Sequence, residues 1–208
     1  MAVRGSARDE LREATGAAHL RLHEIPAFDA LAQGRLTLAA YGTLLRRKLG
    51  FHLALESRLT EAPSLAGFGL DLADRGRAHL LIADLAFLDM PPEAPLAPLP
   101  RFADAAEAMG GLYVAEGSTL GGRHLARALD GLLPPGEEGR RFLLGHGARH
   151  GEMWRSFCDA VERCGATDAG LAGMVRGAHA TFAAFEAWFA PAGVAPGYTP
   201  PNPARVSQ

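Results

Sequence analysis

Two histidines one helical turn apart, His19 and His23, are the first residues of this chain whose type and spacing suggest chemistry. Side chains four residues apart share a helix face, so two imidazoles could bind one metal ion. The glutamate that zinc hydrolases of the His-Glu-x-x-His type need is missing, and no Glu-x-x-His pair of a di-iron bundle occurs. A single imidazole acting as an axial ligand of heme needs less, and Gly16, Ala17 and Ala18 leave room for a macrocycle edge. Two partly exposed histidines on an amphipathic helix remain the alternative.

The segment between residues 110 and 125 has the apolar spacing of a helix, yet it contains several glycines. Three of them, Gly117, Gly121 and Gly122, together weaken a helix by roughly 3 kcal/mol relative to alanines. At about 100° per residue, Gly110, Gly117 and Gly121 share one stripe, and His124 continues it. A flat, bulky ligand could lie against this bare face, or a second helix could cross it closely. The glycine pattern alone leaves both interpretations open.

Length and composition favour a single domain. The chain has 208 residues without a Ser/Gly-rich or charged linker, so we expect a helical domain at 1–190 and a proline-rich tail at 191–208. A net charge of -2 with scattered arginines argues against a nucleic-acid partner. We find no apolar leader and no run of ~18 apolar residues, so we expect no membrane partner and a cytoplasmic location.

The apolar pattern predicts an all-α chain. Apolar residues recur every three or four positions, and no segment alternates with period two. Ser6 and Thr37 are candidate N-caps, and the prolines between residues 91 and 100 predict an extended crossover. The expected helices are 6–24, 27–33, 37–60, 71–90, 101–132, 137–144, 151–164 and 167–189.

Two motifs together resemble the biliverdin-producing heme oxygenases, especially the bacterial branch associated with phytochromes. The motifs are Leu11-Arg12-x-Ala14-Thr15-x-x-x-His19 and Tyr113-Val114-x-Glu116-Gly117-Ser118-Thr119-Leu120-Gly121-Gly122, in that family's order. The similarity continues into 142–147 and 153–157, so it covers most of the chain except its first few residues and its tail. It implies a compact helical bundle of the heme oxygenase type, with heme b between the first helix and a kinked, glycine-rich distal helix.

The resemblance also implies roles for individual residues. His19 is then the proximal ligand of the heme iron, and Arg12 binds a propionate. Gly117, Ser118, Gly121 and Gly122 form the distal wall, Thr15 and Tyr113 belong to the heme-binding motifs, and Arg155 and Arg176 are further propionate candidates. Ser118 stands where animal members have an aspartate that organises water, and His23 stands where many members have a glutamate. His52 is a candidate for holding water on the distal side, with a surface or packing histidine as the equal alternative.

The implied reaction is oxidative opening of the heme ring to biliverdin, with release of carbon monoxide and ferrous iron. Heme is then substrate and cofactor together, and dioxygen enters beside the glycines. Electrons come from an external donor such as a ferredoxin, a flavodoxin or a reductase, because the sequence has no Rossmann fingerprint, flavin signature or iron–sulfur cysteines. A bacteriophytochrome is implied as the acceptor of biliverdin.

Two other classes of function stay open at this point. A non-catalytic heme carrier or sensor could use the same pocket, with His124 as a second axial ligand. A non-heme enzyme on a related helical fold, such as the thiaminase-like proteins, would use Cys158 or Cys164 as its nucleophile. The spacing of these cysteines fits neither a zinc site nor a redox Cys-x-x-Cys motif, so we expect two reduced thiols.

Overall fold

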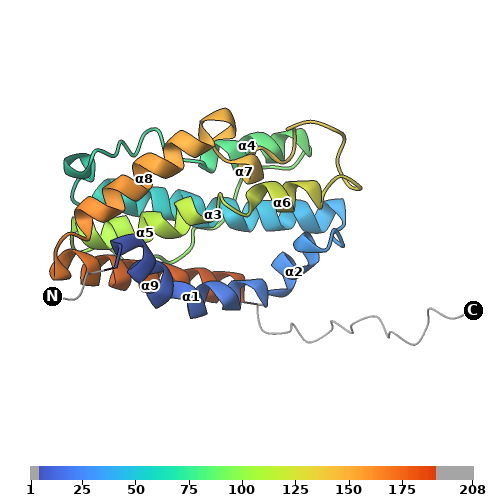
Figure 1. Ribbon diagram of the computed structural model, residues 1–208. Helices are drawn as coiled ribbons and strands as arrows, with labels where there is room; N and C mark the ends of the chain where they lie inside the picture. Colours follow the sequence, from blue (N-terminus) through green and yellow to red (C-terminus); the bar gives the residue numbers. More distant parts are fainter. Residues whose placement is uncertain (1–4, 191–208) are drawn as a thin grey trace, which may run out of the picture.

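The computed structural model describes residues 5–190, and within them every regular element is a helix (Figure 1). This confirms the all-α prediction. The tail predicted at 191–208 lies outside the described residues. None of the described helices combines the length and apolar character needed to span a bilayer. The elements are α1 (Ala7–His23), α2 (Pro26–Ala32), α3 (Leu38–Glu61), η1 (Ala66–Phe68), α4 (Ala78–Phe87), α5 (Ala105–Gly117), α6 (Gly122–Arg127), α7 (Arg141–Leu144), η2 (Gly147–Arg149), α8 (His150–Cys164) and α9 (Asp168–Phe189).

The helix starts follow the predicted capping chemistry. Ser6 accepts a hydrogen bond from the backbone N–H of Asp9 at the start of α1, and Thr37 accepts one from Ala40 at the start of α3. These side chains satisfy backbone donors that have no partner inside the helix. Both predicted N-caps are therefore confirmed.

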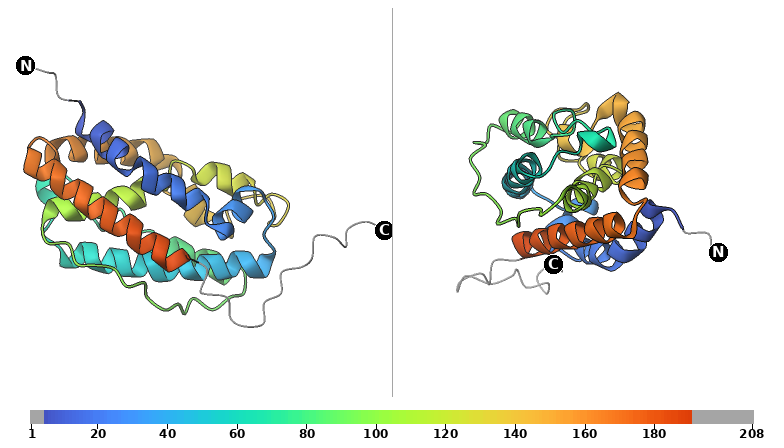
Figure 2. Two further views of the ribbon diagram at one scale, coloured as in Figure 1. Left: turned by 90° about the horizontal axis from the view of Figure 1, so that it is seen from below. Right: turned by 90° about the vertical axis from the view of Figure 1, so that its left-hand side faces the viewer.

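Helices α5 and α9 cross at a contact made of backbone. A Cβ atom added to Gly110 would lie 2.0 Å from the carbonyl oxygen of Met174, and one added to Gly177 would lie 2.0 Å from that of Glu107. Real Cβ atoms do not approach so closely, so the two helices touch because each lacks a side chain at the crossing. Helix α1 lies beside α9 on the face seen in the left view of Figure 2. The interpretation of Gly110 as part of a helix crossing is therefore correct.

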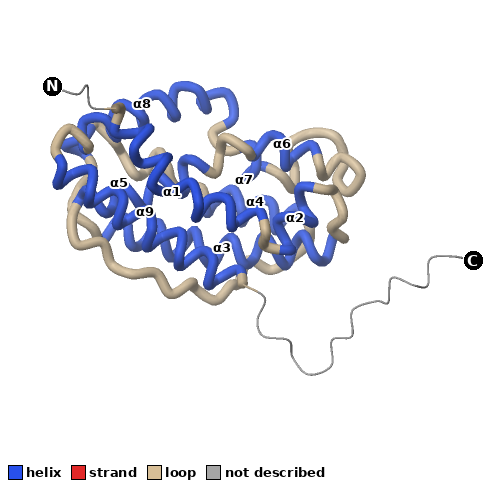
Figure 3. The backbone as a smooth tube through the Cα atoms, turned by 60° about the horizontal axis from the view of Figure 1, so that its bottom comes forward, coloured by secondary structure: helices blue, strands red, loops and turns tan. Residues whose placement is uncertain are grey.

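The central helix α3 carries much of the core, and the proline-rich crossover runs along it (Figure 3). The backbone N–H of Ala97 donates to the carbonyl of Gly50 at 3.2 Å, and the Arg58 guanidinium donates to the carbonyl of Leu99 at 3.1 Å. No helix includes residues 88–104, which confirms the extended crossover. The crossover closes one side of the bundle and lets α5 return beside α9.

Two predicted helices start later than expected because side chains from other elements cap them. The expected start at Asp71 is wrong, because helix α4 begins at Ala78. There the Glu56 carboxylate accepts hydrogen bonds from the backbone N–H groups of Arg77 and Ala78. The carboxylate of Asp84 accepts from the first residues of α7 in the same way, at 2.8 and 2.9 Å. Helix α7 therefore covers only the end of the expected 137–144, since Gly139 has a positive φ of 75°.

The helix expected at 101–132 is broken. Helix α5 ends at Gly117 and α6 begins at Gly122, beyond the break in the ribbon of Figure 1. Between them the backbone hydrogen bonds change from the i→i−4 to the i→i−3 pattern. The N–H of Thr119 donates to the carbonyl of Glu116, and the N–H of Leu120 donates to that of Gly117. We call residues 117–122 the glycine segment. Its glycines weaken the helix at the place where the kink was implied.

Candidate active site

A cavity of about 410 Å³ lies between α1 and α5 and extends inward to α3 and α9. Its size is within the range of small-molecule sites. Helix α1 lines it with Arg8, Arg12, Thr15, Gly16 and His19, helix α5 and the glycine segment with Tyr113, Val114, Gly117, Ser118 and Leu120, helix α3 with Lys48, Phe51 and His52, and α8 and α9 with Trp154, Phe182 and Phe185.

Two glycines give this cavity room for a flat ligand. A Cβ atom added to Gly16 on α1 or to Gly117 on α5 would have no neighbouring atom within 4 Å. Both residues line the cavity, so their missing side chains leave space in it on two different helices. This is the opposite of Gly110, which is needed for packing. Helices α1 and α5 therefore both leave room at this cavity for a flat ligand.

His19 presents the only imidazole of α1 that lines this cavity. Its ring packs edge-on against Phe182 at 6.5 Å and against His23 at 5.1 Å between ring centroids. Partial burial and the neighbouring charge of His23 lower the pKa of His19, which favours the neutral imidazole that metals bind. Among the described residues, no third His, Cys, Asp or Glu joins the two histidines in a metal-binding group.

The glycine segment is held from outside the cavity by Arg77. Its guanidinium donates to the carbonyl of Ala115 at 2.7 Å and to the hydroxyl of Ser118 at 2.8 Å. The Ser118 hydroxyl in turn donates to Ala115 at 2.6 Å. Arg77 is 3% exposed, so these bonds fix the kink from a buried position.

A buried ion pair fixes the preceding turn of α5. Glu116 lies 3.1 Å from the guanidinium of Arg75 and 3.6 Å from the ring of His146, and it is 2% exposed. Burial alone would raise the pKa of Glu116, but His146 and Arg75 hold that pKa below its usual value. Arg75 also donates to Ser156 on α8 at 2.8 Å. Glu116 therefore stabilises this turn as a charged carboxylate, and it is not a candidate general acid.

The α3 side of the cavity is basic. Burial lowers the pKa of Lys48 to about 7, helped by the charge of Arg77. Burial also lowers the pKa of His52 well below its usual value, as do the charges of Arg77 and Lys48. His52 is therefore a neutral ring near neutral pH, packed 4.8 Å from Phe142 between centroids.

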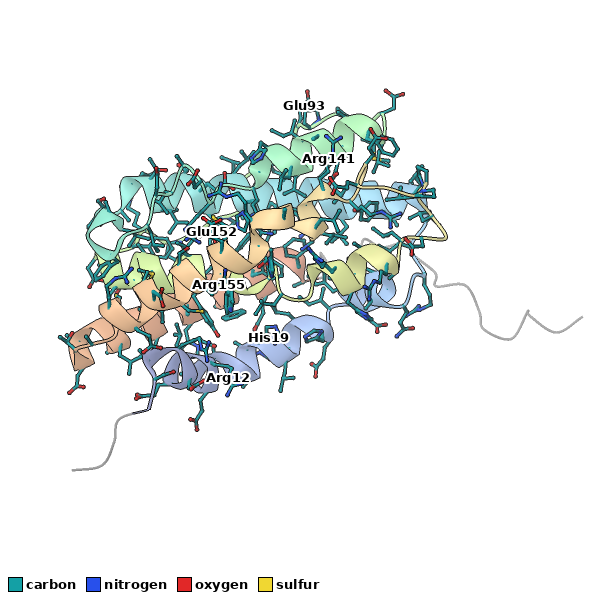
Figure 4. The ribbon with its side chains drawn as sticks, turned by 45° about the horizontal axis from the view of Figure 1, so that its top comes forward. Arg12, His19, Glu93, Arg141, Glu152 and Arg155 are labelled. Atoms are coloured by element: carbon teal, nitrogen blue, oxygen red, sulfur yellow. The ribbon has the colours of Figure 1, made fainter. Side chains whose placement is uncertain are left out.

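Most of the residues predicted from sequence meet at this cavity. Arg12, Thr15, His19, Tyr113, Gly117, Ser118 and His52 all line it. Gly121 and Gly122 do not; Gly121 faces open space, whereas a Cβ on Gly122 would lie 1.9 Å from the carbonyl of Leu143. Figure 4 shows Arg12 and His19 on α1 and Arg155 on α8. Arg155 and Arg176 are outside the lining, and Arg176 binds Glu107 at 3.1 Å.

Sequence reasoning missed the groups that support the glycine segment. Arg75 and Arg77 lie within the helix expected at 71–90. The non-helical turn that carries both side chains was therefore not predicted. Lys48 was missed because a lysine on a helix usually faces solvent. The only signal was its place one turn before His52 on the apolar face of α3.

The two cysteines differ in their surroundings: the guanidinium of Arg8 donates to the Sγ of Cys158 at 4.0 Å, whereas Cys164 is buried. Both are free thiols, and burial, together with the charge of Asp104, raises the pKa of Cys164 to about 11. A thiol with a raised pKa is a poor nucleophile near neutral pH. Neither cysteine lines the cavity. His124 is exposed and also lies outside the lining.

The comparisons with known proteins agree with this geometry. The family model described as heme oxygenase matches residues 6–191. The chain belongs to the heme oxygenase family. It is 34% identical over 164 residues to a heme oxygenase of Xanthomonas campestris pv. campestris, covering 75% of this chain and 92% of that protein.

Two solved heme oxygenases share the fold. The enzyme of Neisseria meningitidis, solved with NO and CO bound, has a TM-score of 0.72 at 26% identity and covers 95% of this chain and 100% of its own. The heme complex of heme oxygenase-1 from Synechocystis sp. PCC6803 has a TM-score of 0.70 at 16% identity, covering 89% and 91%. This heme oxygenase is therefore an oxidoreductase that opens heme to biliverdin with release of carbon monoxide and ferrous iron. The carrier alternative is not favoured.

Proposed function

We propose that this chain binds heme b with His19 as the axial ligand of the iron and with the glycine segment on the other side of the ring. The observation that carries the proposal is that His19 and Gly117, from two different helices, line the same cavity. The free space beside Gly16 and Gly117 fits a planar ring. The neutral imidazole favoured at His19 fits the ligand of a heme iron.

Arg12 is the proposed partner of a heme propionate. Its side chain is 77% exposed, it lines the cavity, and its ion pair to Asp9 at 3.7 Å is of the weak surface type. A carboxylate of the ligand can therefore replace Asp9 at small cost. Arg176 is a weaker candidate, because it already pairs with Glu107.

The bound heme supplies the iron at which dioxygen is activated and the ring that is opened. The chain's own part is to leave space and to hold water. Gly117 leaves the space beside the ring for dioxygen, and Gly121 is proposed to extend it, while Gly122 is proposed to support this wall by letting it pack against the backbone of Leu143. Thr15 and Tyr113 pack against the ring edge in this proposal, since both line the cavity. Ser118, held by Arg77, and the neutral ring of His52 supply polar groups for water.

The partners follow from the reaction. Ring opening consumes electrons, so we propose an external donor such as a ferredoxin, a flavodoxin or a reductase. A bacteriophytochrome remains the proposed acceptor of biliverdin, on the resemblance of the two sequence motifs to that branch of the family. The cytoplasm is the proposed location.

The test is a hemin titration of the purified protein, followed by addition of reductant in air. We expect a Soret band that forms on hemin binding, then decays as a bilin band appears. The His19→Ala variant should lose normal ligation and bilin formation, while His23→Ala should retain both, because His23 does not line the cavity. Full activity in His19→Ala with loss in His23→Ala would refute the assignment of the ligand.

A further inference from the structure

Lys48 is the only lysine of the sequence, and it is buried at the inner end of the cavity. Every other basic residue apart from the histidines is an arginine. An arginine keeps its charge in proteins, whereas a buried lysine can lose or gain a proton near neutral pH. The one position occupied by lysine is thus a position where the charge can change.

Among residues 5–190, aromatic rings surround the Lys48 amine and no carboxylate pairs with it. Its nitrogen lies between 4.6 and 5.9 Å from the ring centroids of Phe28, Phe142, Phe185 and Phe189, contributed by α2, α7 and α9. The electron-rich faces of such rings attract a cation without neutralising it. No carboxylate within residues 5–190 forms an ion pair with Lys48, although burial makes an unpaired charge costly.

The charged and titratable groups near this amine are basic. His52 lies one turn further along α3, and Arg47, the preceding residue, lies over the rings of Trp188 and Phe189. Arg77, from the turn before α4, lies 4.7 Å from the centroid of Phe142, while the Lys48 nitrogen lies 5.5 Å from it. Arg77 also donates to Ser118, and Lys48 lines the same cavity as Gly117 and Ser118. Basic groups therefore line and surround this end of the cavity.

We propose that Lys48 is the anion-binding group of the cavity, and that its ammonium group forms an ion pair with a small negatively charged ligand that enters beside the glycine segment. The inference rests on the proposed function, because dioxygen becomes negatively charged as it receives electrons from the external donor. An ammonium ion at the inner end stabilises that charge without a preformed counter-ion to compete. Neutral ligands of the same size gain nothing from it.

The direct test compares an anion with a neutral ligand in hemin-loaded protein. Azide is titrated into the ferric form and carbon monoxide into the ferrous form of the parent, of Lys48→Met and of Arg101→Met. Methionine keeps the length of the side chain and removes its charge, and Arg101 is a surface residue outside the cavity lining. We expect the azide dissociation constant of Lys48→Met to rise about tenfold at pH 6. Carbon monoxide affinity should stay within about twofold of the parent, and Arg101→Met should change neither.

Equal azide affinity in the parent and Lys48→Met would overturn this inference and leave the proposed function intact. Equal weakening of azide and carbon monoxide would also overturn it, because that result indicates altered packing. A parent protein that binds no hemin would overturn both proposals. These outcomes are distinguishable in one set of titrations.

A second measurement uses hemin-free protein. The unfolded lysine keeps its proton up to about pH 10.4, whereas the folded protein loses it near pH 7. The folded state is therefore penalised fully below pH 7, and the penalty declines as the pH rises toward 10. We expect Lys48→Met to have a higher urea midpoint than the parent at pH 7, with a difference that shrinks by pH 10. A difference that is independent of pH would contradict the buried, unpaired amine on which the inference depends.

Discussion

Two glycines of α5, Gly110 near its middle and Gly117 at its C-terminal end, serve opposite purposes. At Gly110 a Cβ atom would collide with the backbone of α9, whereas at Gly117 it would meet nothing within 4 Å. The first glycine lets two helices touch, and the second leaves space in a cavity that His19 also lines. One stripe of small residues therefore serves packing at one end and ligand binding at the other. A substitution separates the two roles, since it costs stability at the first end and heme chemistry at the second.

The largest effect is expected for Gly110→Ala. Overpacking against α9 costs about 3 kcal/mol, and the better helix propensity of alanine returns about 1 kcal/mol. We therefore expect a net loss of about 2 kcal/mol in unfolding free energy, measured by urea denaturation of the hemin-free protein. Gly131→Ala is the matched control, because its Cβ meets no atom within 4 Å. Equal stability of the two variants would show that α5 and α9 do not depend on this contact.

Gly121→Leu tests how far the ligand-binding end extends. A leucine here has open space around it, so the urea midpoint should change little. Hemin binding through His19 should survive, while bilin yield falls because the side chain takes space needed by dioxygen or its water. Hemin affinity and bilin yield are measured on the same preparation. A parent-level bilin yield would restrict the ligand-binding end to Gly117 and Ser118.

The smallest effect is expected for His124→Ala. This histidine continues the glycine stripe in sequence, but it is exposed and lies outside the cavity lining. The absorption spectrum of the ferric heme complex should therefore stay unchanged. Loss of a low-spin, bis-histidine spectrum in this variant would revive the carrier interpretation.

The helix pattern was predictable because capping and apolar periodicity act locally. Ser6, Thr37 and the crossover prolines specify their elements from nearby residues alone. The late start of α4 was not predictable, since it depends on Glu56 from another helix.

The same limit applies to the site. Its motif residues were recognisable by their spacing and their resemblance to a family. The support of the glycine segment by Arg77 and the aromatic surroundings of Lys48 arise only from tertiary packing. For the same reason the sequence alone could not assign Gly110 to helix packing and Gly117 to the cavity.

The most direct test of the separate roles of Gly110 and Gly117 is the Gly117→Leu variant, with hemin affinity and urea midpoint measured together. The leucine fills part of the cavity that His19 and Gly117 line, so we predict at least about a tenfold loss of hemin affinity, equivalent to about 1.4 kcal/mol. The urea midpoint of the hemin-free protein should not fall, because the side chain meets no packed atoms and leucine favours the helix. Parent-level hemin affinity, or a loss of stability like that of Gly110→Ala, would contradict the assignment of this end of α5 to heme.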